Sequence, residues 1–191
     1  MTESKDQEDE SVARYRETGS REDFEAFARQ WLPSIRRFLY VHLGADLQAC
    51  EEVQQEVLVA LVRNLAGFGG KAKFSTFLYR LVHHKAVDYL RKEGRHRRRT
   101  LSLDTDAGFE AFEDGDGDPV DTLVRQDTAR RLFAHILALP PGERELLHLR
   151  EIEEMSEKEC SVILGVPVGT LKSRLHRLKK KLFDTMTKEG D

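Results

Sequence analysis

Residues 155–182 read MSEKECSVILGVPVGTLKSRLHRLKKKL, and this stretch decides the fold that the sequence predicts. Ser156 and Glu159 form a capping box, in which each side chain accepts a hydrogen bond from a backbone N–H left free at a helix start. Gly165 suits the left-handed position that ends this helix, and Pro167 suits the first turn of the next one. The pattern predicts a short helix, a turn of about three residues and a second helix, which is a helix-turn-helix.

The second helix of this pair has an apolar face and a basic face. Four leucines recur at steps of four, three and four and form a stripe for packing: Leu171, Leu175, Leu178 and Leu182. Another face carries Lys172, Ser173, His176, Arg177 and Lys180. Residues 172–181 hold six lysines or arginines and no acidic residue, so this helix suits a polyanion. A solvated surface helix is the alternative, but the capping box, the glycine turn and the basic helix together favour binding to double-stranded DNA.

Length, charge and cysteine content limit the class of protein. A chain of 191 residues is long enough for one large or two small domains. The net charge of -3 hides a segregation, because acidic residues concentrate in 1–10 and 104–121, whereas basic residues concentrate in 91–99 and in the last helix. Cys50 and Cys160 belong to no CxxC or Cys/His cluster, which fits a reducing compartment without structural disulfides. Without a signal peptide or an apolar run of roughly 18 residues, a cytoplasmic protein with no membrane insertion is expected.

The N-terminal part is expected to be a mobile acidic tail over residues 1–19, followed by helices. Ser20 and Asp23 resemble a helix cap, and large apolar residues follow at helical spacing. Pro33 is expected to interrupt this helix and to start a second one. A long helix is predicted over residues 47–65. Its polar face carries Glu51, Glu52, Gln55, Glu56 and Arg63, and the residues alone are compatible with a solvated face.

Residues 66–99 combine a glycine-rich loop with a helix that mixes aromatic and basic side chains. The loop AGFGGKAK lacks the GxxxxGK[ST] pattern and is not expected to cradle phosphate. Ser75 is expected to cap the following helix, which carries Tyr79, Arg80, His83 and His84 outside its apolar side. Interleaved aromatic and basic side chains favour single-stranded nucleic acid, because bases stack on rings while cations neutralise phosphates. Helix neighbours point about 100 degrees apart, so the two adjacent histidines do not predict a metal site.

Two segments together point to a family. Residues 49–95, ACEEVQQEVLVALVRNLAGFGGKAKFSTFLYRLVHHKAVDYLRKEGR, and residues 139–182, LPPGERELLHLREIEEMSEKECSVILGVPVGTLKSRLHRLKKKL, resemble regions two and four of sigma-70-type RNA polymerase sigma factors. The resemblance is to the small extracytoplasmic-function (ECF) group, and it covers about residues 22–99 and 122–181 in the right order. It implies an all-α fold of two small helical domains joined by an acidic flexible linker. The expected parts are a tail (1–19), a region two domain (20–99), the linker (100–121), a region four domain (122–185) and a tail (186–191).

The resemblance implies a promoter-specificity subunit of bacterial core RNA polymerase that has no catalytic residues, cofactor or metal of its own. Docking on the clamp helices of the largest catalytic subunit would use Glu52, Gln55 and Glu56. Recognition and melting of the minus-10 strand would use Phe68, Lys71, Lys73, Phe77, Tyr79, Arg80, His83 and His84. Bases of the minus-35 element in promoter DNA would be read by Lys172, Ser173, His176 and Arg177. The flanking phosphates would be held by Thr170, Arg174, Lys179 and Lys180.

Two positions depart from the family pattern. Phe77 replaces the usual tryptophan, and His84 replaces the usual asparagine, where an imidazole is expected to change base preference or add pH sensitivity. The position of His176 varies in the family and tunes the minus-35 sequence. The acidic linker resembles the segment that threads toward the RNA exit path in the family, although a simple tether is the alternative. An anti-sigma factor is the further partner that the resemblance implies, and it would hold the free protein inactive.

Three other classes of protein fit the sequence less well. A dimeric transcription regulator with the same helix-turn-helix would lack the resemblance of the first half and would favour a palindromic site. A nucleic-acid enzyme would need metal-ligand spacing, a nucleophile motif or a nucleotide-binding loop, none of which the sequence contains. A module that binds only other proteins conflicts with the basic recognition helix.

Overall fold

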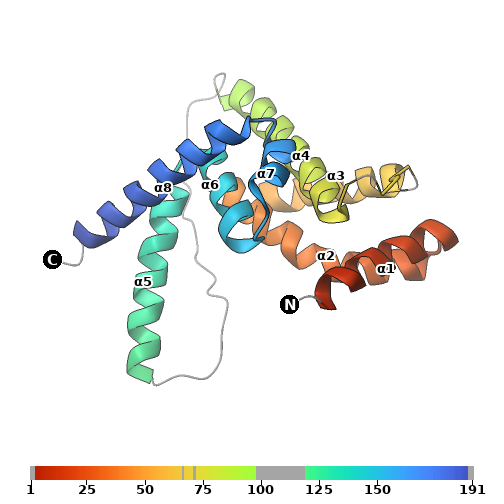
Figure 1. The fold of residues 1–191 in the computed structure, drawn as a ribbon, viewed down its shortest axis with the longest axis horizontal. Coiled ribbons are helices and arrows are strands. Elements are labelled where there is room, and N and C mark those ends of the chain that lie inside the picture. The colour runs from red at the N-terminus through yellow and green to blue at the C-terminus, as the bar shows by residue number, and fades with distance from the viewer. Residues whose placement is uncertain (1–2, 66, 71, 98–118, 189–191) are drawn as a thin grey trace.

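The structure is a computed structural model that describes residues 3–65, 67–70, 72–97 and 119–188 (Figure 1). Lys71 and nearly all of the predicted acidic linker therefore lie outside the described residues. Every regular element within these ranges is helical, which confirms the all-α prediction. None of the described helices is both long enough and apolar enough to cross a lipid bilayer.

Within the described residues, four helices build the N-terminal half: α1 (Glu3–Thr18), α2 (Arg21–His42), α3 (Leu47–Leu65) and α4 (Phe74–Arg97). Helices α2, α3 and α4 pack against one another, and α1 lies along α2 (Figure 1). Their inward stripes supply the most buried side chains, among them Phe27, Ile35, Phe38, Val57, Leu61, Leu78 and Val82. The helix predicted over residues 47–65 is α3 with the same bounds.

The N-terminal half differs from the prediction at both of its first two helices. The expected mobile tail is largely helix α1, because Val12 is only 3% exposed and the ring of Tyr15 lies 5.3 Å from that of Phe24. Pro33 does not divide the chain, since α2 runs through it without a break. A proline costs a helix one hydrogen bond and some straightness, and apolar packing on both sides of Pro33 outweighs that cost.

The part of the C-terminal half that the structure describes, residues 119–188, contains five elements: α5 (Pro119–Leu137), α6 (Pro141–Leu147), the π-helical turn η1 (His148–Ile152), α7 (Glu157–Leu164) and α8 (Val168–Lys188). Helix α5 begins before residue 122, and the proline pair at 140 and 141 lies at the start of α6, the second helix of this half. Helix α8 runs past residue 185, where a tail was expected. One smaller helix-start prediction differs as well, because Ser75 lies inside α4, one residue after its start.

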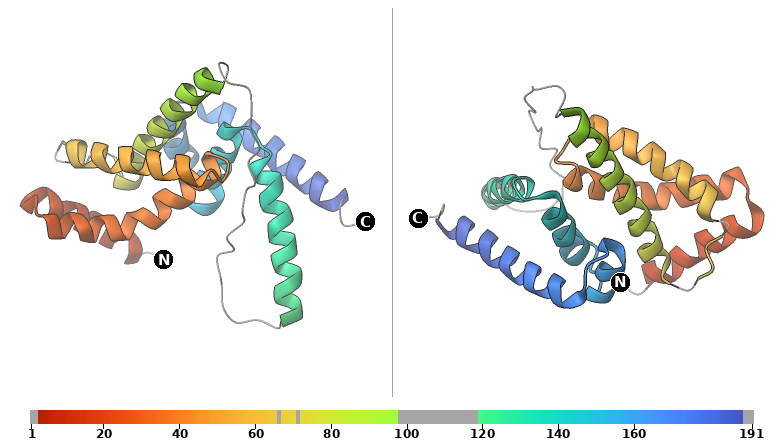
Figure 2. Two further views of the ribbon diagram at one scale, coloured as in Figure 1. Left: turned by 180° about the vertical axis from the view of Figure 1, so that it is seen from behind. Right: turned by 90° about the horizontal axis from the view of Figure 1, so that it is seen from above.

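The two halves are packed together. In the view from above, the first four helices lie on one side and the last elements on the other, and the halves meet where α7 lies beside α4 (Figure 2). Helix α6 also contacts α2. Buried apolar residues of both halves form one connected cluster, which includes Phe38 and Leu78 from the first half and Leu149 and Ile163 from the second. The structure therefore has a seam between the halves, which we define by the contacts α4–α7 and α2–α6.

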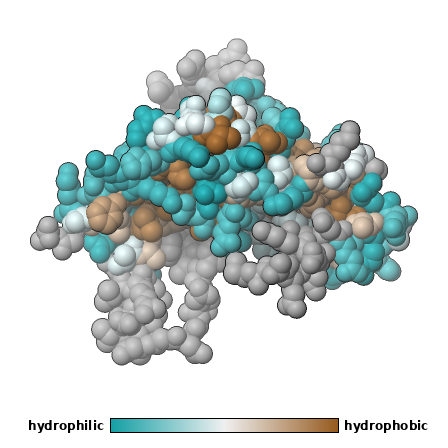
Figure 3. Space-filling view, in the orientation of Figure 1, coloured by the Kyte–Doolittle hydropathy of each residue, from teal (hydrophilic) through white to brown (hydrophobic). Residues whose placement is uncertain are grey.

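The surface seen in Figure 3 is mostly hydrophilic, with small apolar patches over α8 and near α4 and α7. Two of the exposed large apolar side chains are Val59 on α3 and Phe183 on α8, which are 51% and 70% exposed. Single exposed apolar residues are common on protein surfaces, so polar and charged groups decide what most of this surface binds.

Candidate nucleic-acid interface

The helix-turn-helix forms as the sequence predicts. The Ser156 backbone N–H donates to Glu159 Oε2 at 2.8 Å, and the Glu159 N–H donates to Ser156 Oγ at 3.3 Å, which completes the capping box of α7. Gly165 ends α7 with a φ of 64°, in the left-handed region that glycine adopts most easily. Pro167 precedes α8, and its carbonyl accepts a hydrogen bond from the Leu171 N–H at 3.0 Å. Helix α8 thus has a fixed start and a fixed angle to α7.

Helix α8 carries its cations in three rows around a buried stripe. Leu171 and Leu178 are buried and face the rest of the C-terminal half. At 100 degrees per residue, the opposite row holds Ser173, His176, Arg177 and Lys180, all of which are exposed. We call these four residues the outer row. Side chains at their spacing share one face of a helix, so the outer row can enter a groove of duplex DNA together.

The other predicted residues of α8 lie on its flanks. On one flank, Lys172 Nζ is 3.3 Å from Glu157 Oε2, and Lys179 Nζ is 2.8 Å from Glu151 Oε1. On the other flank, Arg174 lines a groove between α6 and α8. Thr170 is exposed at the start of the helix, where its carbonyl accepts a hydrogen bond from Ser173 Oγ. Lys172 and Lys179 would each have to break an ion pair with a carboxylate before binding DNA. The four outer-row side chains are exposed on the face opposite the buried stripe.

The predicted docking face of α3 is a polar surface with an apolar centre. Glu52 and Gln55 are exposed, and both line a groove with Val59 and Leu81. Glu56 differs, because its carboxylate is 3.1 Å from Lys85 Nζ and 3.6 Å from Lys92 Nζ. The hydrogen bond from Lys85 is the main cause that lowers the pKa of Glu56. Glu56 therefore ties α3 to α4, while Glu52 and Gln55 are the more accessible groups.

The residues predicted to hold the minus-10 strand are divided by the fold. Phe68 and Phe77 are half-buried, and their ring centroids lie 5.0 Å apart in a cluster with Phe74. Arg80 and His84 are exposed on α4. Burial, reinforced by the nearby charges of His83 and Arg80, lowers the pKa of His84. These side chains form one surface at the loop and the outer side of α4.

The remaining members of that set lie in the seam. Tyr79 is 1% exposed, and its ring centroid lies 5.3 Å from that of Phe38. His83 Nδ1 is 2.6 Å from Glu145 Oε1 on α6, and Lys73 Nζ is 2.8 Å from Glu159 Oε1 on α7. Lys71 lies outside the described residues. The sequence predicts Tyr79 and His83 outside the apolar side of the helix; the structure buries Tyr79, whereas His83 is half-buried against a polar partner, Glu145.

Comparison with known proteins identifies the family. The family model described as "Sigma-70 region 2" matches residues 27–96, and the model described as "Sigma-70, region 4" matches residues 130–182. The chain belongs to the sigma-70 family. The resemblance identified from the sequence is therefore confirmed, and the two halves of the fold are region 2 and region 4. A dimeric regulator with only a helix-turn-helix does not account for the region 2 match.

Two relatives place this sigma factor in the ECF group. The ECF RNA polymerase sigma-E factor of Escherichia coli (strain K12) is 33% identical over 137 residues, which is 69% of this chain and 70% of that protein. The ECF RNA polymerase sigma factor SigW of Bacillus subtilis (strain 168) is 29% identical over 173 residues, which is 87% of this chain and 92% of that protein. With both regions matched in order, the chain is a promoter-recognition sigma subunit of RNA polymerase.

Solved structures agree with the fold. The sigma factor RpoE in complex with the anti-sigma factor NepR from Bartonella quintana has a TM-score of 0.68 at 21% identity, and the likeness covers 87% of this chain and 97% of that one. CnrH in complex with the cytosolic domain of CnrY has a TM-score of 0.61 at 20% identity, and the likeness covers 93% of this chain and 95% of that one. At these identities the likeness concerns the fold of regions 2 and 4.

The seam between region 2 and region 4 contains a buried polar network that the sequence patterns do not reveal. Glu145 is 1% exposed and lies between His83 and His42, whose Nδ1 is 3.6 Å from Glu145 Oε2. Burial lowers the pKa of His42 despite the opposing effect of Glu145. Arg144 donates to the His42 carbonyl at 3.1 Å and to the Leu137 carbonyl at 2.9 Å. The one guanidinium thus satisfies backbone carbonyls at the C-terminal ends of both α2 and α5.

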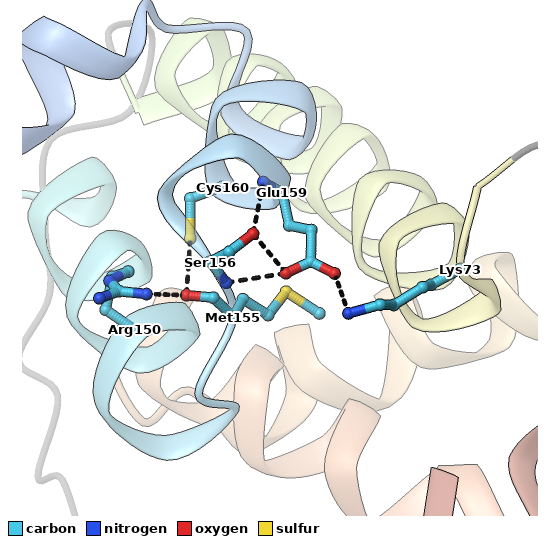
Figure 4. A network of polar contacts seen from close by, with 6 residues as sticks. All are labelled: Lys73, Arg150, Met155, Ser156, Glu159 and Cys160. Carbon is cyan, nitrogen blue, oxygen red and sulfur yellow. Dashed lines mark hydrogen bonds and ion pairs between the residues drawn. The ribbon is translucent and has the colours of Figure 1, made fainter. Parts of the chain in front are cut away.

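A second group of polar contacts lies where α7 meets α4 (Figure 4). Glu159 both completes the capping box of α7 and forms an ion pair with Lys73. Burial would raise the pKa of Glu159, but hydrogen bonds from Lys73 and Ser156 outweigh it and lower that pKa to about 2. Behind it, the Met155 carbonyl accepts from Arg150 and from the thiol of the buried Cys160. The start of α7 is therefore fixed to region 2 and to the turn before it.

Proposed function

We propose that this sigma factor joins core RNA polymerase through α3, reads the minus-35 element as duplex with the outer row of α8, and holds the melted minus-10 strand with region 2. It carries out no chemical step itself and works in the cytoplasm, beside the polymerase. The observation that carries the proposal is the outer row: Ser173, His176, Arg177 and Lys180 are exposed on one face, while Leu171 and Leu178 anchor the helix from behind. A helix held in this way can enter the major groove.

The minus-10 part of the proposal rests on region 2. The Phe68–Phe77 cluster offers ring faces at the loop, and Arg80 and His84 offer donors beside it. Flipping a base out of the stack costs a few kcal/mol, and stacking on rings returns about 1–3 kcal/mol per base. Lys73 and His83 extend this surface once the seam is open. We also include an anti-sigma factor among the partners. Of the two solved structures described above, RpoE is in complex with the anti-sigma factor NepR, and CnrH is in complex with the cytosolic domain of CnrY.

The direct test is reconstitution with core RNA polymerase. We expect the purified chain to co-elute with core polymerase and to make it initiate at discrete sites on genomic DNA fragments. Aligned start sites would then give both promoter elements. DNA binding without polymerase association would contradict the proposal and would leave region 2 without a role.

Arg177→Ala is expected to relax the choice of base at one minus-35 position. Loss of a bidentate contact to guanine costs about 1–3 kcal/mol at that position and little elsewhere. Lys180→Ala is the matched control on the same row, because loss of a phosphate contact weakens all sequences alike and reduces the salt slope by about one. The measurement is holoenzyme binding to a set of promoter duplexes at several salt concentrations. Uniform weakening by Arg177→Ala would show that Arg177 holds a phosphate and not a base.

Glu52→Arg is expected to weaken binding to core polymerase, because it reverses a charge on the accessible part of the α3 face. Like charges at an interface cost on the order of a kcal/mol or more, which is about tenfold in affinity. Glu17→Arg is a suitable control, since Glu17 is exposed on α1. Competition against labelled wild-type protein for core polymerase measures the change. Equal affinities for Glu52→Arg and Glu17→Arg would exclude this face as the docking site.

A further inference from the structure

The flank of α8 that carries Lys172 and Lys179 is neutralised by region 4 itself. These two lysines are seven residues apart, which is about two helical turns, so they lie on the same side of α8. Lys172 Nζ is 3.3 Å from Glu157 Oε2 on α7, and Lys179 Nζ is 2.8 Å from Glu151 Oε1 on η1. We call Lys172 and Lys179 the paired flank, because each of these cations lies beside a carboxylate.

The opposite flank of α8 keeps its positive charge. Arg174 and Lys181 are also seven residues apart, and both line the groove between α6 and α8. Arg177 of the outer row borders the same groove, and Glu143 is the acidic residue among those that line it. Within the described part of the chain, neither Arg174 nor Lys181 forms an ion pair. We call Arg174 and Lys181 the open flank, because their charges are available to a ligand.

The width of α8 determines what its two flanks would meet on DNA. A helix with its side chains is about 10–12 Å across, and the major groove of B-form DNA is about 12 Å wide. With the outer row on the floor of the groove, the flanks therefore face the two phosphate backbones that border it. The paired flank would face one strand, and the open flank would face the other.

We propose that α8 holds the phosphates of one DNA strand with the open flank, while Glu151 and Glu157 screen the paired flank from the phosphates of the other strand. This inference rests on the minus-35 role proposed above for the outer row. An exposed ion pair is weak by itself, so its strength alone would not keep a lysine from DNA. Repulsion decides instead, because a lysine that moves to a phosphate leaves its carboxylate unpaired beside a polyanion.

The one-sided contact favours selection of the promoter. Lys181, which the sequence analysis did not assign, becomes a phosphate ligand beside Arg174. Each phosphate contact strengthens binding to every DNA sequence alike. By withholding two lysines from such contacts, Glu151 and Glu157 lower the affinity for DNA without a promoter and reduce the salt dependence of binding. The base contacts of the outer row then decide where the sigma factor binds.

The test uses holoenzyme reconstituted from core polymerase and the full-length chain, on duplexes that carry the promoter found by reconstitution. Phosphates beside the minus-35 element are replaced with uncharged methylphosphonates, on one strand at a time, and the affinity is measured at several salt concentrations. For the wild type, we expect replacement on one strand to weaken binding about eightfold per contact in about 0.1 M salt, the effect of one counterion-releasing contact. Replacement on the other strand should change the affinity by no more than about twofold.

The double variant Glu151→Gln, Glu157→Gln removes both screening carboxylates. We expect its salt slope to become steeper by up to about two, because two lysines gain phosphates, and its binding to become sensitive to replacement on both strands. Lys181→Ala should make the salt slope shallower by about one and reduce the effect of replacement on the first strand. Glu154→Gln is the matched control and should behave as the wild type, because Glu154 is exposed between η1 and α7 and forms no ion pair with α8 in the described contacts.

Far-ultraviolet circular dichroism establishes that each variant is folded. Equal weakening by replacement on either strand in the wild type would overturn the inference, as would an unchanged salt slope in the double variant or in Lys181→Ala. A steeper salt slope in Glu154→Gln would also overturn it, because the effect would then come from net charge and not from the two ion pairs. The proposed function is scored separately on unmodified DNA: failure to discriminate the promoter from a duplex with a scrambled minus-35 element would contradict the minus-35 role itself.

Discussion

Phe38→Ala is expected to lower the free energy of unfolding by about 3–5 kcal/mol, the usual cost of removing a buried aromatic ring. Phe38 is 0% exposed and lies at the junction of the two regions. Its ring centroid is 5.3 Å from that of Tyr79, 5.8 Å from that of His42 and 5.4 Å from that of His148 in region 4. The cavity left by the ring would therefore open in the core of region 2 and at the seam. Urea unfolding followed by circular dichroism measures the change.

Phe183→Ala is the matched control for this prediction. Phe183 is 70% exposed, so its loss should change the free energy of unfolding by no more than about 0.5 kcal/mol. A loss below about 1 kcal/mol for Phe38→Ala would mean that the ring is not packed in solution as described, since cavities in well-packed cores cost more than this.

Local patterns predicted the parts of the fold that local chemistry fixes. The capping box of Ser156 and Glu159 and the left-handed Gly165 set the ends of α7 within a few residues of sequence. The leucine stripe of α8 predicted the side that packs, where Leu171 and Leu178 are buried and Leu175 and Leu182 are half-buried. The same geometry places Ser173, His176, Arg177 and Lys180 on one row. It places Lys172, which the sequence analysis grouped with the base-reading residues, on the flank beside Glu157. The continuity of helix α2 was not predicted, because a proline such as Pro33 usually ends a helix, and here the packing of the residues on both sides of it keeps the helix continuous.

The seam could not be predicted in this way, because its partners are far apart in the chain. Glu145 is 62 residues from His83, and Arg144 is 102 residues from His42. Nothing in the spacing of acidic residues on α6 marks Glu145 as buried. One signal was present, since His83 lies four residues after Tyr79 and three before Ala86, on a continuous face of α4. Both neighbours are buried, so an imidazole between them is expected to face a partner and not solvent.

Arg144→Ala is expected to weaken the seam and to separate the unfolding of the two regions. Arg144 is 7% exposed and closes two helix ends, through the carbonyls of His42 and Leu137. An unpaired buried acceptor costs about 1–3 kcal/mol, so the closed arrangement should lose on the order of 3 kcal/mol for the two. Gly44 allows the Arg144 guanidinium to approach the backbone closely, because a Cβ at this position would lie 3.0 Å from Arg144 Nη1. The φ of +78° at Gly44 is also a conformation that favours glycine.

The variant can avoid part of this cost by opening, because water then reaches the His42 carbonyl in region 2. The Leu137 carbonyl belongs to region 4 and gains less from opening. Calorimetry of the wild type is therefore expected to show one cooperative transition, and that of Arg144→Ala to show two. Arg144→Lys is the matched control: an ammonium keeps the charge but lacks the planar fork, so it should restore cooperativity only in part. A single transition in Arg144→Ala, shifted or not, would mean that apolar contacts such as those of Phe38 couple the regions without the guanidinium.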